Sequence, residues 1–182
     1  MARSVSKLPA HPHLEARQGS IPEVPDLDDL LEGVDYVVAM LGDVQAQQTR
    51  AINTEFVEVL IPAMRRHQVA RFLYQAGGLS APPGQQLPAT FRTILNTVAR
   101  SYIGQHKDNE AVMRYLAEHA MDIQWMVHRA GIGSDGPSNG DLHRSETQYS
   151  IATFRDVAAY SHRILTDDSA VHTCDLSTYQ SS

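Results

Sequence analysis

Residues Asp35–Gly42 (DYVVAMLG) form an apolar run that ends in glycine and precedes a stretch with helical periodicity. Such a run is typical of a buried parallel strand whose carboxyl end faces a bound nucleotide. In a dinucleotide-binding fold, a strand, a glycine-rich turn and a helix that hold the pyrophosphate normally come before this unit. Only 34 residues precede Asp35, and their only glycines are Gly19 and Gly33. The sequence therefore predicts a nucleotide-binding domain whose first unit is absent.

Composition restricts the class of protein and its partners. The chain has 182 residues, which favours a single domain, and its 42% hydrophobic and 20% charged residues are typical of globular proteins. The net charge of −6 argues against a nucleic-acid partner, because phosphate binding needs a basic surface. The one cysteine, Cys174, suits a reducing compartment. Since neither a signal peptide nor an apolar run of about 18 residues occurs, we expect a cytoplasmic protein that does not enter a membrane.

Apolar periodicity predicts strands that alternate with helices. Buried strands are expected at Asp35–Leu41, Ala70–Gln75 and Ile123–His128, and helices at Ala46–His67 and Thr153–Leu165. The remaining expected elements are a short helix at Pro25–Glu32, a helical stretch from Phe91 to about Ala120 that Gly104 interrupts, a loop at Gly131–Gly140 and a short strand at Val171–Leu176. This alternation predicts an α/β fold, a Rossmann-like parallel sheet in three layers, truncated at its N-terminus.

The expected site follows from this topology. Right-handed crossovers place the carboxyl ends of parallel strands at one edge of the sheet, where ligands bind. That edge would carry Leu41–Asp43, Gln75–Gly78 and Arg129–Gly133.

One glycine pattern offers two interpretations. Gly131 to Gly136 (GIGSDG) matches G-x-G-x-x-G and follows a predicted strand. The pattern binds phosphate where it also opens a helix, but Pro137 and Gly140 follow at once. A plain loop is therefore favoured, with a phosphate-binding loop as the alternative. The nine histidines show no H-x-x-x-H spacing, so no metal site is expected.

Four segments carry a resemblance to a known family. They are VDYVVAMLGD (34–43), VARFLYQAGGLS (69–80), HKDNEAVMRYLAEHAMDIQWMVHRAGIG (106–133) and ATFRDVAAYSHRIL (152–165). Their order is similar to that of atypical short-chain dehydrogenase/reductase proteins, and the chain resembles the NmrA-like, NAD(P)H-binding group that includes biliverdin-IXβ/flavin reductase. The resemblance covers nearly the whole chain as a run of weak motifs.

The resemblance implies a set of contacts to NADP, or to NAD. They are Arg3 and Lys7 at the 2′-phosphate, Ser20 and Ile21 at the adenine, Leu41 and Gly42 at the adenosine ribose and pyrophosphate, Gln75, Ala76 and Gly77 at the nicotinamide ribose, Lys107 at a ribose, and Ala130, Gly131 and Ile132 against the nicotinamide. The alternative for Arg3 and Lys7 is a solvated tail. This chain departs from the family pattern at Ser20, where Asp is usual, at Gly77, which has no hydroxyl, and at Ala130, where proline is usual.

The pair Tyr102 and Lys107 departs from the family's Tyr-x-x-x-Lys spacing by one residue. One residue turns the pair by about 100° around a helix. We therefore expect Tyr102 in the core and Lys107 in solvent, with the ribose contact of Lys107 as the alternative. The resemblance identifies no catalytic residue.

The chemistry implied by the resemblance is hydride transfer from NADPH to a small-molecule redox acceptor, such as a flavin, a quinone or a tetrapyrrole-like compound. One alternative is a regulator that senses NAD(P) without turnover. Another is a truncated chain that binds no cofactor and pairs the exposed edge of its first strand with a partner or with itself, as a homodimer. Without the first unit, that edge would expose Tyr36, Val37, Val38 and Met40, and NADP would bind weakly or not at all.

Overall fold

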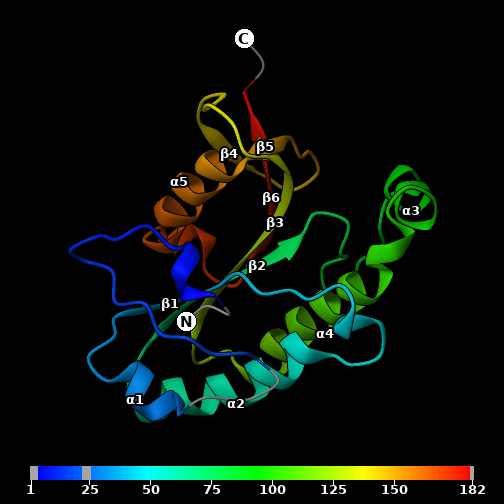
Figure 1. Ribbon diagram of the computed structural model, residues 1–182. Helices are drawn as coiled ribbons and strands as arrows, with labels where there is room; N and C mark the ends of the chain where they lie inside the picture. Colours follow the sequence, from blue (N-terminus) through cyan, green and yellow to red (C-terminus); the bar gives the residue numbers. More distant parts are fainter. Residues whose placement is uncertain (1–3, 22–25, 181–182) are drawn as a thin grey trace.

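The computed structural model describes residues 4–21 and 26–180, except for the side chains of Lys7 and Ile132. Its sheet has the strand order β1-β2-β3-β6-β4, and β5 pairs with β3. Figure 1 shows α2 and α4 on one side of this sheet and α5 on the other. The predicted three-layer α/β Rossmann-like fold is therefore confirmed. Within the described ranges, no helix combines the length and apolar character needed to cross a membrane.

The elements have the following bounds. The strands are β1 (Tyr36–Ala39), β2 (Arg71–Gly77), β3 (Gln124–Ser134), β4 (Leu142–Ser145), β5 (Ile151–Thr153) and β6 (Cys174–Tyr179). The helices are α1 (Leu27–Leu31), α2 (Ile52–Arg66), α3 (Ala89–Asn96), α4 (Ile103–His119) and α5 (Phe154–Leu165), with 3₁₀ turns at Val5–Lys7, Ala46–Gln48, Arg100–Tyr102 and Asp168–Ala170. All strand pairs are parallel except β4 with β6.

Each face of the sheet has its own apolar core. Alternate residues of β2 point to opposite faces, so that Phe72 and Tyr74 pack with α2 and α4, whereas Leu73 packs with α5. The predicted apolar face of α2 is buried, because residues such as Phe56 and Leu60 lie four apart on one side of the helix. The sequence pattern therefore located both helical layers correctly.

Strand β3 is longer than the sequence pattern predicted. Residues Gly131–Ser134 continue the strand because they pair with β5, so the expected loop at Gly131–Gly140 is wrong over these four residues. No helix follows until α5 begins at Phe154. The G-x-G-x-x-G match therefore lacks the helix start that phosphate binding requires, as the favoured interpretation expected.

The helical stretch after Phe91 breaks earlier than predicted. Helix α3 ends at Asn96, and Gly104 lies within the first turn of α4. A Cβ at Gly104 would stand 2.1 Å from the carbonyl oxygen of Gln47. Glycine therefore allows α4 to pack against the segment before α2, instead of interrupting the helix. Tyr102, expected in the core, is 44% exposed because it lies in this break.

Strand β1 stands at the end of the sheet order and shows much of the expected apolar exposure. Tyr36, Val38 and Met40 are 46%, 45% and 49% exposed. Val37, which we also expected to be exposed, instead packs against the α2 and α4 core. The difference follows from the alternation of side chains along a strand, because helices cover only one face of β1.

Candidate functional site

Two glycines near the carboxyl ends of β1 and β3, Gly42 just beyond β1 and Gly131 within β3, are each covered by another side chain. A Cβ at Gly42 would lie 2.5 Å from Nε2 of Gln105, and a Cβ at Gly131 would lie 2.5 Å from Cδ2 of Tyr149. The Tyr149 ring also meets Phe91 of α3 edge-on, with 5.0 Å between ring centroids. Nothing in the sequence pattern pointed to Gln105 or Tyr149, because both reach this edge from distant segments.

The glycine at the end of β2 is covered by a histidine. A Cβ at Gly77 would lie 2.6 Å from Cε1 of His106, which is 7% exposed. The Nδ1 atom of this histidine is 2.8 Å from Oγ of Ser80. Burial lowers the pKa of His106 to about 4, because an apolar environment disfavours the charged imidazole. The ring that faces this part of the edge is therefore neutral at pH 7.

A chain of buried hydrogen bonds runs from His106 into the interior. Nδ2 of Asn109 donates to Oγ of Ser80 at 3.4 Å. The hydroxyl of Tyr74 donates to Oδ1 of Asn109 at 2.6 Å and accepts from Nδ2 of Asn53 at 2.8 Å. Burial raises the pKa of Tyr74 far above its usual value, so that its hydroxyl stays protonated and remains a donor. These side chains join α2, β2 and α4 behind the edge.

Asp108 of α4 ties the start of α2 to the same region. Its carboxylate accepts the backbone N–H of Asn53 at 2.9 Å and that of Thr54 at 3.0 Å. It also accepts from Oγ1 of Thr54 and from Nε2 of Gln47, each at 2.7 Å. Ala51, the N-cap residue of α2, makes no side-chain cap. Asp108 therefore supplies the cap from another helix.

The predicted nicotinamide end of the site is assembled by strand register. Gln75, Ala76 and Gly77 of β2 pair with residues 128–130 of β3 in a continuous parallel ladder. Ala76 and Ala130 are buried, and Gly131 lies one residue beyond Ala130 on β3. The structure therefore brings these predicted site residues together, and Ile132 continues the same strand opposite Ala152.

The predicted adenosine end is less completely described. Leu41 and Ile21 are partly buried against the α2 and α4 core, and Ser20 forms a single β bridge. Arg3 and the side chain of Lys7 lie outside the described residues. The 2′-phosphate contact of these two residues therefore stays a prediction.

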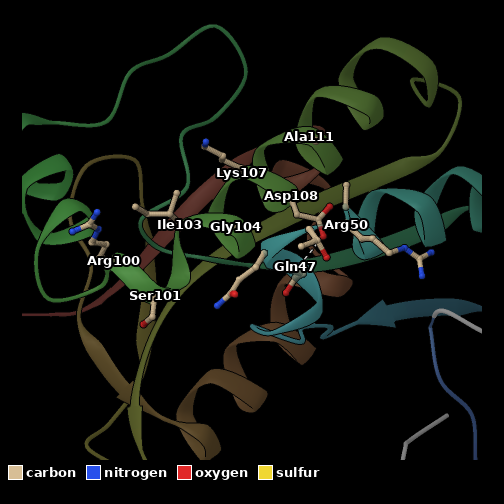
Figure 2. Close-up of a pocket in the computed structure, with 12 residues that line it drawn as sticks. Gln47, Arg50, Arg100, Ser101, Ile103, Gly104, Lys107, Asp108 and Ala111 are labelled. Atoms are coloured by element: carbon tan, nitrogen blue, oxygen red, sulfur yellow. Dashed lines mark hydrogen bonds between the residues drawn. The ribbon is translucent and has the colours of Figure 1, made fainter.

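Lys107 lies apart from Gly77, in a pocket of about 440 Å³ between α4 and the segment before α2. Arg50 and Arg100 line the same pocket. In Figure 2 these three cationic side chains point in different directions, so they do not converge on one point. Lys107 is exposed, as expected for a solvated residue.

Two enclosed polar atoms test whether this edge suits a nicotinamide cofactor. Oε1 of Gln75 and Nε of Arg129 have no hydrogen-bond partner in residues 4–21 and 26–180. One is an acceptor and the other a donor, and they stand on adjacent register rows of β2 and β3, so their side chains point to opposite faces of the sheet. The ribose hydroxyls and the carboxamide of a nicotinamide nucleotide both donate and accept, so each of the two atoms suits a polar group of the cofactor on its own face of the sheet. The described residues contain no cluster of three or more side chains that could hold a metal ion.

Comparisons with known proteins identify the family of the chain. A family model described as NAD(P)H-binding matches residues 1–168. A 3β-hydroxysteroid dehydrogenase/Δ5→4-isomerase of Mycobacterium tuberculosis is 29% identical over 147 residues, which cover 74% of this chain and 40% of that protein. The chain thus spans about 40% of the length of this curated relative.

Solved structures share the fold at low identity. The oxidoreductase ylbE of Lactococcus lactis has a TM-score of 0.73 at 16% identity, covering 100% of this chain and 78% of its own. An anaerobillin reductase, ChuY, of Escherichia coli O157:H7 has a TM-score of 0.59 at 13% identity, covering 81% and 66%. A short-chain dehydrogenase/reductase of Veillonella parvula has a TM-score of 0.58 at 15% identity, covering 88% and 69%. At these identities, the likeness is one of fold.

Proposed function

Because the chain belongs to the NAD(P)H-binding family, we propose that it is a reductase that transfers hydride from NADPH to a flavin, quinone or tetrapyrrole-like acceptor. One observation carries the proposal: three adjacent parallel strands each have a glycine at or near the carboxyl end, Gly42, Gly77 and Gly131, and an unpartnered acceptor at Gln75 lies next to Gly77. When bound, the cofactor supplies the hydride, and the protein mainly orients it.

The residues of the edge have distinct tasks in this proposal. Leu41 and Gly42 border the adenosine ribose and pyrophosphate, and Gln75 and Gly77 border the nicotinamide ribose. Gly131 and its covering ring, Tyr149, form the wall against the nicotinamide. Because Tyr149 also contacts Phe91, this aromatic pair excludes water from the side where the acceptor enters.

A regulator that senses NAD(P) without turnover is the second candidate. Two observations favour it. The first is that Gly77 has no hydroxyl. The second is that Tyr102 and Lys107 do not form a pair at Gly77, because Tyr102 is exposed in the helix break and Lys107 lines a separate pocket. Such a protein needs the same cofactor edge but no acceptor site.

Titration with NADPH and NADH, followed by steady-state oxidation with FMN or a water-soluble quinone, separates the candidates. Calorimetry should extend to millimolar ligand, so that weak binding is also detected. Binding with turnover supports the reductase, and binding without turnover supports the sensor. A chain that binds neither nucleotide contradicts both. Tighter binding of NADPH than of NADH supports the proposed 2′-phosphate contact of Arg3 and Lys7.

A further inference from the structure

We propose that His106 binds the nicotinamide ribose, by donating a hydrogen bond from its Nε2–H to a ribose hydroxyl at the carboxyl end of β2. The inference rests on the proposed function and concerns a residue that neither the sequence pattern nor the resemblance pointed to. In the family pattern a serine or threonine hydroxyl often stands at the position of Gly77. In this chain, the polar group nearest that position belongs to the ring above it, because Cε1 of His106 would lie 2.6 Å from a Cβ at Gly77.

The direction of the hydrogen bonds fixes the tautomer of the ring. The proton of Tyr74 points to Oδ1 of Asn109, because a carbonyl oxygen can only accept. The amide of Asn109 then donates to Oγ of Ser80. The hydroxyl of Ser80, which is fully buried, is left to donate its own proton to Nδ1 of His106 at 2.8 Å. A neutral imidazole whose Nδ1 accepts carries its proton on Nε2.

The Nε2 atom is the open end of this chain of hydrogen bonds. Among residues 4–21 and 26–180, it has no hydrogen-bond partner and is not one of the fully enclosed polar atoms. The ring cannot turn freely, since Nδ1 is hydrogen-bonded to Ser80 and the Nδ1–Cε1 side of the ring lies over Gly77. The donor is therefore fixed in place before any ligand arrives, which reduces the entropy that binding costs.

The neutral state of the ring suits this role. Burial keeps the pKa of His106 near 4, so the same donor is present throughout the neutral pH range. A charged imidazolium would instead need a proton on Nδ1, and Ser80 would then have to accept two hydrogen bonds while its own proton had no acceptor in the described region.

The test combines NMR on the wild-type chain with NADPH titrations of three variants. Long-range ¹H–¹⁵N spectra report which nitrogen of His106 carries the proton, before and after addition of NADPH. The variants are His106→Phe, which keeps a ring and removes both nitrogens, His106→Gln, which restores a side-chain N–H donor, and His119→Phe on the exposed end of the same helix. Far-UV circular dichroism checks that each variant is folded.

In the NMR spectra we expect the Nε2–H tautomer, with an Nε2 resonance that shifts when NADPH is added. We expect His106→Phe to bind NADPH about tenfold more weakly than the wild type, because one good hydrogen bond is lost. His106→Gln should recover part of this loss, and His119→Phe should bind like the wild type. An Nδ1–H tautomer, or equal affinity of wild type and His106→Phe, would overturn the inference and leave the proposed function intact. A wild-type chain whose resonances do not respond to millimolar NADPH would overturn the proposed function, and the inference with it.

Discussion

The imidazole of His106 occupies the space above Gly77 that any side chain at position 77 would need. A Cβ there would lie 2.6 Å from Cε1 and 3.1 Å from Nδ1 of the ring. The ring is hydrogen-bonded to the buried Ser80 and cannot move aside without breaking that contact. The end of β2 at Gly77 and the first turns of α4 at His106 are thus closely packed against each other.

Replacement of Gly77 by alanine should therefore destabilise the fold. We expect Gly77→Ala to lower the free energy of unfolding by about 1–3 kcal/mol, because an added methyl group in a tightly packed site forces its neighbours to shift. Urea denaturation measures the change. Gly136→Ala is the matched control, since a Cβ there would have Thr153 Cγ2 at an ordinary 3.8 Å. Equal stability of the two variants would show that His106 moves freely.

Asp108 should contribute more to stability than an exposed carboxylate does. Asp108→Asn keeps the shape but replaces one acceptor oxygen by a donor that faces backbone N–H groups. We expect a loss of about 2–4 kcal/mol in the free energy of unfolding, as when one partner of a buried charged hydrogen-bond network is removed. Asp122→Asn, which breaks an exposed ion pair with Arg65, should cost at most about 1 kcal/mol. A reversed ranking in thermal or urea unfolding would argue against the cap.

Stability should fall as the pH is lowered below about 6.5. Burial lowers the pKa of His106 to about 4 and that of His128, which contacts Ser177, to about 3. The unfolded chain therefore binds protons at these sites from its ordinary histidine pKa downward, while the folded chain does not. Each site should cost about 1.4 kcal/mol of stability per pH unit between pH 6.5 and its folded pKa.

Urea unfolding at several pH values between 4.5 and 6.5 measures this slope. His128→Gln should make it shallower, because one buried neutral histidine is removed. His119→Gln changes an exposed histidine and should leave the slope near that of the wild type. If His128→Gln and the wild type have the same slope, His128 is not held neutral by burial.

The exposed face of β1 should promote association of the chain with itself. Val38 is 45% exposed on this face, and a lysine there should reduce self-association, as charges on sheet edges do in natural proteins. We propose a homodimer through this strand and expect Val38→Lys to shift the protein toward monomer in analytical ultracentrifugation at little cost in stability. Val37→Lys is the contrasting variant, since Val37 packs against the core and a lysine there should lower the melting temperature. A monomeric wild type would contradict the dimer.

Most of the fold follows from local apolar patterns. The strands around Tyr36 and Phe72 and the helix around Leu60 could be predicted because their periodicity directly reflects burial. The short strands β4 and β5 could not, since Leu142–Ser145 and Ile151–Thr153 are too short to show a period and become strands only by pairing with β6 and β3.

The candidate site was predictable in its backbone but not in its side chains. Gly42 and Gly77 lie at or just beyond the carboxyl ends of β1 and β2, where strand topology predicted them, whereas Gly131 lies inside the longer β3. The residues above them were not predictable, because Gln105 and His106 depend on where α4 starts and Tyr149 lies in the segment between β4 and β5. The first turn of α4 packs closely against the carbonyl of Gln47 at Gly104, a contact that no local pattern reveals.

The cap of α2 and the contacts at Gly77 come from one turn of α4. Asp108 holds the start of α2, while Asn109 donates to Ser80, which holds the ring of His106 at the edge. Adaptation of this turn to a new ligand would therefore reduce thermal tolerance at the same time, a trade-off between activity and stability. Directed evolution toward a different acceptor should accordingly leave Ser80 and residues 106–109 unchanged and collect its substitutions in the loops at 82–88 and 146–150, where changes do not disturb the start of α2.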